Sequence, residues 1–342
     1  MKETVMRRVG FVDGRDEDDS RRHWADEDSR PLAWAAWYPA EDRAAEALVL
    51  LGPPDAPLFN MGAVARGARL RTEPRTFPVV LLSHGTGGAA TDLGWLGRRL
   101  AAEGFVVIGV NHHGNTQVEP YRPEGFLCWW ERPRDLTAVL DRLSRRGLFA
   151  DRLDANRVFA IGFSLGGYTI LSLVGAITDI DLFRRWGEGQ ATARGPREFP
   201  NLADHVAPLL ETSRVFRESW KRHSESCRDA RIKSAVVCAP APPIRSFTVQ
   251  SLGAVQVSVK ITVGGADTEA PVGPYSGWLH EHLPNSSLNL LGASVGHYVF
   301  LCESTVAGRA LRPDLCVDAP DVDRRAVHDR VAALALRQFL EP

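Results

Sequence analysis

The chain has 342 residues, with 41 lysines and arginines against 42 aspartates and glutamates, and a formal net charge of −1 at pH 7. Because the two signs are interspersed, neither a nucleic-acid footprint nor an electrostatic membrane anchor is expected. No apolar run reaches the roughly 18–20 residues of a membrane span, and residues 1–20 lack the apolar core of a secretory signal. The simplest expectation is a cytoplasmic protein; secretion stays open if a signal peptide preceded this sequence.

The N-terminal part is expected to form two strands followed by an irregular segment. Apolar residues at 9–12 and 32–38 predict an antiparallel pair at the edge of a sheet. Residues 41–78 are rich in proline, glycine and arginine, which favours an irregular excursion near a site entrance.

From residue 79 onward, buried strands alternate with amphipathic helices. Strands are predicted at 79–83, 105–110 and 158–161, and leucines at helical spacing mark helices around 93–100 and 136–143. This alternation predicts an α/β fold, a mostly parallel sheet with helices on both faces. Ligands of such sheets bind at the carboxyl ends of the strands.

The most informative motif is Gly162-Phe163-Ser164-Leu165-Gly166-Gly167, which directly follows the strand at 158–161. A strand that stops at G-x-S-x-G and continues as a helix places its serine on a sharp turn, with small residues needed two positions on either side. The helical run 168–174 supplies the second half of that context. Ser164 is therefore the candidate nucleophile for attack on a carbonyl.

A carboxylate and a histidine follow the serine in the order that this arrangement requires. The strand at 259–263 is broken at once by Gly-Gly-Ala-Asp, so Asp267 lies at a carboxyl edge and can orient an imidazole. A glycine-rich loop further on carries His297, the candidate general base. The alternative carboxylates are Glu269 and Glu303.

A second glycine-rich loop, at 84–88, follows the strand at 79–83. Its backbone N–H groups can approach a ligand closely, so we expect Thr86 and Leu165 to supply the two N–H groups of an oxyanion hole. His84 is expected to order this loop or to contact substrate.

Residues 177–231 interrupt the alternation and are predicted to form a cap over the site. The predicted core then has an N-terminal part, 1–176, and a C-terminal part, 232–342. The aromatic side chains of the cap include Trp186 and Trp220, which either line an apolar pocket or pack the cap onto the sheet.

Two further sets of residues have less specific meanings. His112 and His113 follow a strand at the active edge, where they serve loop structure or substrate contact; no metal site is predicted, because no third ligand has metal-binding spacing. Cys302 and Cys316 flank a short loop, and whether they form a disulfide is left open.

Several motifs together resemble the α/β-hydrolase superfamily, and within it the bacterial dienelactone-hydrolase-like proteins, which are close to the platelet-activating-factor acetylhydrolases. The resemblance runs from about residue 32 to the C-terminus and is weakest in the cap. It implies a serine hydrolase with no cofactor that acts on esters, thioesters or lactones. The motifs that carry it lie at 37–39, 82–88, 110–116, 129–136, 162–167, 264–267 and 296–298.

The sequence departs from this family pattern in two places. The acetylhydrolases have their acid just after the strand that follows the nucleophile helix, but here the strand at 232–238 ends without a carboxylate, which favours Asp267. True dienelactone hydrolases use a cysteine nucleophile, and this chain has Ser164, so dienelactone itself is not the expected substrate.

The predicted function is hydrolysis of a small-molecule carboxylic ester, thioester or lactone through an acyl-enzyme. The alternatives are an acyltransferase or cyclase that uses the same acyl-enzyme, an amidase, and a non-enzymatic ligand-binding protein. No cofactor is expected, and the sequence does not address the oligomeric state.

Overall fold

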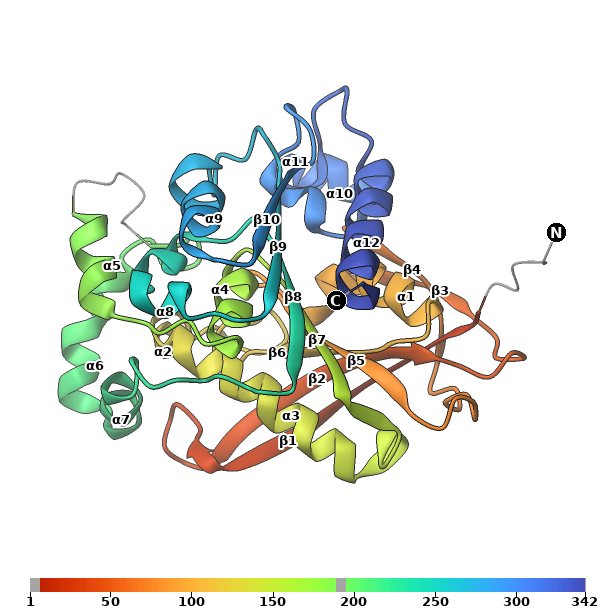
Figure 1. The fold of residues 1–342 in the computed structure, drawn as a ribbon, viewed down its shortest axis with the longest axis horizontal. Coiled ribbons are helices and arrows are strands. Elements are labelled where there is room, and N and C mark those ends of the chain that lie inside the picture. Colours follow the sequence, from red (N-terminus) through yellow and green to blue (C-terminus); the bar gives the residue numbers. More distant parts are fainter. Residues whose placement is uncertain (1–6, 189–194, 342) are drawn as a thin grey trace.

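A large twisted sheet forms the centre of the computed structural model, which describes residues 7–188 and 195–341 (Figure 1). Its eleven strands follow the order β10-β9-β8-β7-β5-β6-β2-β1-β4-β11, and β3 pairs with β4 beside this path. The strands are β1 (Val9–Arg22), β2 (Ser29–Pro39), β3 (Ala47–Leu51), β4 (Phe59–Arg66), β5 (Phe77–Ser83), β6 (Val106–Asn111), β7 (Leu153–Phe163), β8 (Ile232–Cys238), β9 (Ser258–Val263), β10 (Ser286–Leu290) and β11 (Glu303–Ser304).

The six strands from β10 to β6 are parallel to one another. They arise from continuous apolar runs because both faces of a parallel sheet are covered: every residue from Val79 to Leu82 is fully buried. Strand β2 is antiparallel to β6, and β1 is antiparallel to β2. The predicted α/β class is confirmed.

Helices cover both faces of this sheet (Figure 1). Leu81 points into a core that includes side chains of α3, α4, α8 and α9, whereas its neighbour Leu82 points into a core that includes α1 and α12. The alternation follows from the two-residue period of a strand. These helices are α1 (Gly94–Ala102), α3 (Arg132–Arg145), α4 (Leu165–Leu173), α8 (Val249–Gly253), α9 (Trp278–His282) and α12 (Arg324–Leu340).

The prediction for residues 41–78 is wrong, because this segment contains the antiparallel strands β3 and β4. Gly52, Pro53 and Pro54 lie in the turn between them, while Val49, Met61 and Val64 are buried against the core. Strand β4 also pairs with β1, so β1 and β2 are not edge strands. The excursion still reaches the large cavity described below, which Leu51 and Leu58 help to line.

The segment predicted as a cap contributes three short helices, α5 (Ile180–Gly187), α6 (Val206–Thr212) and α7 (Arg214–Lys221), which gather at one end of the molecule near α2 (Pro123–Leu127) (Figure 1). Phe216 of α7 packs with Phe126 and Trp130 in a small separate core. Within residues 7–188 and 195–341, no helix combines the length and apolar character of a membrane span. The cellular location stays a prediction.

Candidate active site

Ser164 lies on the turn between β7 and α4, in a conformation that side-chain-bearing residues rarely adopt, with φ 54° and ψ −117°. The turn is tight because its glycines leave no room for a Cβ. A Cβ on Gly162 would lie 2.2 Å from the carbonyl oxygen of Gly166, and one on Gly166 would lie 2.0 Å from that of Ser83. The Ser164 N–H donates to the carbonyl of Cys238 on the neighbouring strand β8 at 2.9 Å, which anchors the turn.

Three side chains from distant parts of the chain meet at this turn, and we call Ser164, His297 and Asp267 the cavity set. His297 Nε2 lies 3.1 Å from Ser164 Oγ, and His297 Nδ1 lies 2.7 Å from Asp267 Oδ2. With the ring proton on Nδ1, the histidine donates to the carboxylate and accepts from the hydroxyl. This is the geometry that a general base and its orienting acid require.

Asp267 is positioned by the end of β9 and by its own backbone contacts. Its Oδ1 accepts from the N–H of Ala270 at 2.7 Å, so one carboxylate oxygen fixes the loop while the other meets the imidazole. Glu269 lines the cavity but is not paired with His297. Glu303 is in β11, where it forms an ion pair with Arg325 at 2.7 Å.

The loop after β5 lies opposite the serine. Thr86 and Leu165 both line the cavity, and Leu165 is the first residue of α4, so its N–H has no acceptor within the helix. The loop is held from both sides: the Gly87 N–H donates to Asn115 Oδ1 at 2.8 Å, and the Tyr121 hydroxyl donates to the Gly87 carbonyl at 2.7 Å.

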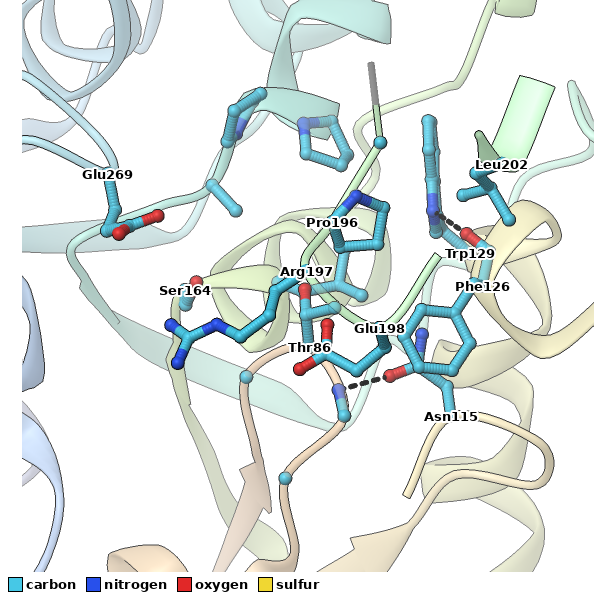
Figure 2. A pocket seen from close by; sticks show the side chains of 18 of the residues that line it. Thr86, Asn115, Phe126, Trp129, Ser164, Pro196, Arg197, Glu198, Leu202 and Glu269 are labelled. Atoms are coloured by element: carbon cyan, nitrogen blue, oxygen red, sulfur yellow. Dashed lines mark hydrogen bonds between the residues drawn. The ribbon is translucent and has the colours of Figure 1, made fainter. Parts of the chain in front are cut away.

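A cavity of about 1510 Å³ opens in front of Ser164, with walls of two kinds (Figure 2). One wall is charged and polar, and Figure 2 shows Arg197 and Glu198 extending into it from the chain beyond residue 195. The other wall is apolar and largely aromatic; it is made of Phe126, Trp129, Ile180, Phe183, Trp186 and Leu202.

Trp186, Trp220 and His84 line the cavity, and their contact with substrate stays a prediction. The two tryptophans also pack within the cap: the Trp186 ring centroid lies 5.8 Å from that of Phe183, and Trp220 lies 5.4 Å from Trp130. The two alternatives for these side chains, lining and packing, are therefore both realised.

Arg197 is a cavity residue that the sequence analysis missed. Its guanidinium donates to Asp314 at 2.8 Å and to the Tyr298 hydroxyl at 2.5 Å, and it lies over the Tyr298 ring. Tyr298 directly follows the histidine of the cavity set, so Arg197 binds the cap to the residue next to that histidine. No local pattern marks this arginine, because its partners are more than 100 residues away in the chain.

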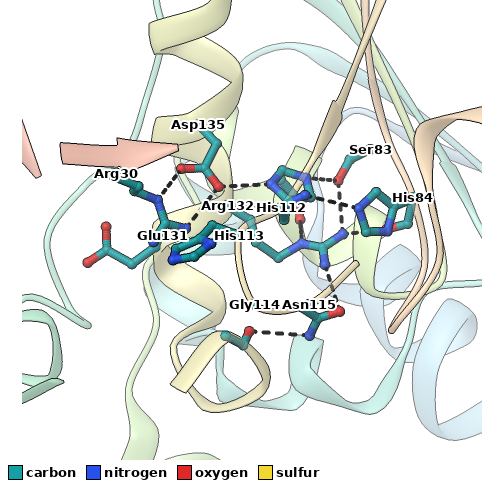
Figure 3. Close-up of polar contacts among 12 residues, drawn as sticks. Arg30, Ser83, His84, His112, His113, Gly114, Asn115, Glu131, Arg132 and Asp135 are labelled. Atoms are coloured by element: carbon teal, nitrogen blue, oxygen red, sulfur yellow. Dashed lines mark hydrogen bonds and ion pairs between the residues drawn. The ribbon is translucent and has the colours of Figure 1, made fainter. Parts of the chain in front are cut away.

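Behind the loop lies a second serine–histidine–aspartate combination, the buried set of Ser83, His112 and Asp135 (Figure 3). His112 Nε2 lies 3.0 Å from Ser83 Oγ, and His112 Nδ1 lies 3.1 Å from Asp135 Oδ2. Asp135 is also paired with Arg30 and Arg21, each at 2.8 Å. Burial and the nearby Arg132 lower the pKa of His112 to about 3, while the two paired arginines hold the pKa of Asp135 well below its usual range against the opposing effect of burial.

Arg132 links this network to both loops of the site. Its Nε donates to Thr169 Oγ1 on α4 at 3.0 Å, and its Nη1 donates to Asn115 Oδ1 at 3.4 Å. Its Nη2 donates to the carbonyl of His84 and, at 3.3 Å, to Ser83 Oγ. Burial lowers the pKa of Arg132 to about 9. One side chain therefore connects the start of the glycine-rich loop to the helix that follows the nucleophile turn.

The structure does not place His112 or His113 in the cavity wall, so the expected substrate contact is corrected to a role in loop structure. His113 Nδ1 is paired with Glu119 at 2.6 Å, and its Nε2 accepts from the Trp24 N–H at 3.3 Å. Burial lowers the pKa of His113 to about 4. The sequence offers one signal for this network, the stretch 129–136, which is among the motifs that carry the family resemblance. That motif alone gives no role for Arg132 or Asp135.

The part of the chain that the structure describes contains neither a metal site nor a disulfide. Within residues 7–188 and 195–341, no group of three or more histidine, cysteine, aspartate or glutamate side chains is arranged to hold a metal ion. All five cysteines are described and all are free, so Cys302 and Cys316 are not bridged.

Comparison with known proteins supports the fold and the branch. A family described as PET hydrolase-like matches residues 70–180, which include the glycine-rich loop and Ser164. Cutinase 2 of Thermobifida cellulosilytica is 33% identical over 159 residues, 43% of this chain and 55% of that protein. Cutinase est2 of Thermobifida alba is 33% identical over 110 residues, 32% of this chain and 33% of the cutinase. A bis(hydroxyethyl) terephthalate hydrolase of Streptomyces coelicolor is 34% identical over 96 residues, 28% of each protein.

Over its full length the chain is similar in structure to a ferulic acid esterase from Streptomyces cinnamoneus, with a TM-score of 0.63, 18% identity, and coverage of 97% of this chain and 89% of the esterase. By contrast, the chain spans about one third to one half of the curated relatives that it matches. The fold and the nucleophile turn define an α/β-hydrolase. Within that superfamily, residues 70–180 match the PET hydrolase-like family, and the matches support the resemblance to the dienelactone-hydrolase-like and acetylhydrolase-like branch that the motifs predicted.

Proposed function

We propose that the protein is a carboxylic-ester hydrolase that forms an acyl-enzyme on Ser164. The observation that carries this proposal is the continuous hydrogen-bonded chain from Ser164 Oγ through His297 to Asp267, which begins at a strained turn on the wall of a large cavity. The ester-hydrolysing relatives support the same class of reaction.

In the first step, the Ser164 hydroxyl attacks the ester carbonyl carbon while His297 Nε2 takes the hydroxyl proton. Asp267 stabilises the imidazolium that forms. The carbonyl oxygen becomes an oxyanion, and the N–H groups of Leu165 and Thr86 donate to it. His297 then gives its proton to the departing alcohol, which leaves the acyl group on the serine.

In the second step, His297 takes a proton from water, and the resulting hydroxide attacks the acyl carbon. The histidine then returns the proton to Ser164 Oγ as the acid departs. Acyl transfer to an alcohol or an amine would use the same acyl-enzyme, with water replaced by that nucleophile, and amide hydrolysis would differ only in the leaving group.

The cap is part of the same proposal. Residues 177–231 supply side chains to the apolar wall, among them Ile180, Phe183 and Leu202, so we infer that this segment selects the substrate while the core supplies the reacting groups. The division into a core of 1–176 and 232–342 with an inserted cap follows from this assignment.

The test is labelling with a fluorophosphonate probe, followed by peptide mapping. We expect one modified serine, at position 164, and loss of labelling when the protein is first incubated with a short p-nitrophenyl ester. Modification of a different serine would overturn the proposal. Product analysis with and without an added alcohol or amine then separates hydrolysis from acyl transfer, because only a transferase gives mainly the new ester or amide.

A further inference from the structure

A second cavity, of about 320 Å³, lies between β4, α1, β11 and α12. None of its lining residues also lines the cavity in front of Ser164. Its volume is at the lower end of the range of small-molecule sites, roughly 300–1,000 Å³. The residues that give it its chemistry are Trp95, Arg98, Arg99, Glu303, Arg325 and His328.

One arginine of this cavity has no direct partner among residues 7–188 and 195–341, and Glu46 and Glu303 stabilise its charge only at longer range. Arg325 is paired with Glu303 at 2.7 Å, and Arg99 is paired with Asp329. Arg98, in contrast, forms no hydrogen bond or ion pair with any residue in 7–188 or 195–341, and its Nε is buried. A partly buried guanidinium without an acceptor is costly, so its retention needs a reason.

The backbone opposite makes room for this arginine. Gly62 of β4 has φ +99°, and a Cβ at that position would lie 2.5 Å from Arg98 Nε. A residue with a side chain there would meet backbone strain and would also push the guanidinium away.

A second lining residue, His328, has a buried ring nitrogen with no hydrogen-bond partner among the described residues. His328 is 1% exposed and stacks on Trp95, with ring centroids 3.7 Å apart and ring planes 3° from parallel. Its Nε2 lies 2.8 Å from the carbonyl oxygen of Val299, so Nε2 carries a proton and donates it. The other nitrogen, Nδ1, has no hydrogen-bond partner among the described residues.

We propose that this cavity binds a small oxyanion, a phosphate or a carboxylate, with Arg98 as its principal counter-charge. The planar fork of a guanidinium matches two oxygens of either anion. An anion oxygen would also accept from Nδ1 of a protonated His328, or a protonated phosphate oxygen would donate to the neutral ring. A phosphate within reach of both side chains would satisfy both groups, whereas a carboxylate would do so only with the protonated ring.

The same rings hold the short helix of the cavity set. Trp95 Nε1 donates to the carbonyl of Phe300 at 2.7 Å, and His328 donates to that of Val299. Both carbonyls belong to η8 (His297–Phe300), whose first residue is the histidine of the site. His328 and Trp95, which line the proposed anion site, therefore also hydrogen-bond the short helix that carries His297.

Calorimetric titration with sodium phosphate and, separately, with sodium acetate tests the proposal without any substrate turnover. We expect saturable binding of at least one anion to the wild type, and binding weakened about tenfold or more in Arg98→Gln, because one charge-assisted contact is lost. Arg337→Gln, an exposed position on α12, is the matched control and should bind like the wild type. Arg197→Gln should also bind normally, because that arginine belongs to the other cavity.

Tighter binding of phosphate than of acetate would identify the ligand as a tetrahedral oxyanion. Tighter binding of acetate would identify it as a carboxylate. Absence of saturable binding of both anions, or equal binding by Arg98→Gln, overturns the proposal. If Arg98→Gln does not fold, NMR of labelled histidine in the wild type decides instead. Burial lowers the pKa of His328 to about 4, and the bound anion should raise it; an unchanged His328 titration in saturating phosphate and acetate would contradict the site.

Discussion

The cavity set and the buried set contain the same three residue types at nearly the same distances. The serine-to-histidine distance is 3.1 Å in the cavity set and 3.0 Å in the buried set, and the histidine-to-aspartate distances are 2.7 Å and 3.1 Å. A serine, a histidine and an aspartate in a hydrogen-bonded row are therefore not enough to define a catalytic site. The surroundings of each set decide what it can do.

The first difference is access and backbone geometry. Ser83 ends strand β5 and is fully buried, whereas Ser164 lies on a strained turn at the start of α4 and lines the cavity. Of the two hydroxyls, that of Ser164 has space in front of it for a carbonyl group, and the proposed N–H donors of Thr86 and Leu165 line the same cavity.

The second difference is charge. In the buried set, Arg132 donates to the serine oxygen, and Arg21 and Arg30 hold the aspartate. Burial and Arg132 lower the pKa of His112 to about 3, so this ring does not take up a proton near neutral pH. A general base must accept one. The buried set is accordingly a structural network that supports the loop of the site.

The largest contrast is expected between the two serines. Ser164→Ala should fold normally and lower kcat for a short p-nitrophenyl ester by about 10⁴–10⁶-fold, since it removes the nucleophile. Ser83→Ala should change kcat less than about tenfold. It should cost about 1–3 kcal/mol of unfolding free energy, because the buried Nε2 of His112 loses its hydrogen bond with the serine hydroxyl. Steady-state kinetics and urea unfolding measure the two effects. Equal activity of Ser164→Ala and the wild type would remove Ser164 from the mechanism.

The two aspartates should separate activity from stability. Asp267→Asn leaves the fold intact but no longer orients the imidazole, so kcat should fall by about 10⁴-fold. Asp135→Asn leaves the buried Arg30 without its carboxylate, while Arg21 keeps Asp18 and Glu131, and should cost about 3–5 kcal/mol of unfolding free energy. Urea unfolding of both variants beside their kinetics checks this. A stable, fully active Asp135→Asn protein would contradict the assignment of the buried set as structural.

The pH dependence of stability should contain a contribution from His112. Its pKa is about 3 in the folded protein and about 6.5 in an unfolded chain. Between these two pH values the unfolded state binds more protons at this histidine than the folded state does. The free energy of unfolding therefore carries no penalty from His112 above pH 6.5. It falls as the pH decreases toward 3, by up to about 1.4 kcal/mol per pH unit. His112→Gln should be less stable at pH 7 but should lose stability less steeply between pH 6.5 and 4.5. His280→Gln, at an exposed position, serves as the control and should keep the wild-type slope.

The smallest loss of activity is expected for Thr86→Ala, because the proposed donor at this position is the backbone N–H. Thr86→Ala keeps that donor and should change kcat less than about tenfold, whereas Thr86→Pro removes it and should cost about 10²–10³-fold. Thermal unfolding of both variants shows whether the loop has kept its structure. A large loss in Thr86→Ala with normal stability would mean that the hydroxyl itself contacts the substrate.

Much of the site was predictable because its signals are local. The strand, the small residues around Ser164 and the helix after it occupy about 15 consecutive positions, and their pattern reflects backbone sterics that act within a few residues. The end of the strand at 259–263 and the glycine-rich loop at 292–298 are recognised in the same way, and they lead to Asp267 and His297. The hairpin at 47–66 was missed, since the prolines and glycines of its turn masked two short strands.

By itself, the sequence determined the α/β class, the nucleophile turn and the order of the serine, the acid and the histidine. Only the tertiary structure decided that His112 faces a buried network rather than the cavity, that Arg132 connects the two loops, and that Arg197 reaches the histidine from the cap. The physical reason is the range of the interactions. Periodicity and turn chemistry depend on neighbouring residues. Whether a side chain at the end of a strand faces the cavity or a buried network depends on how elements far apart in the chain pack together.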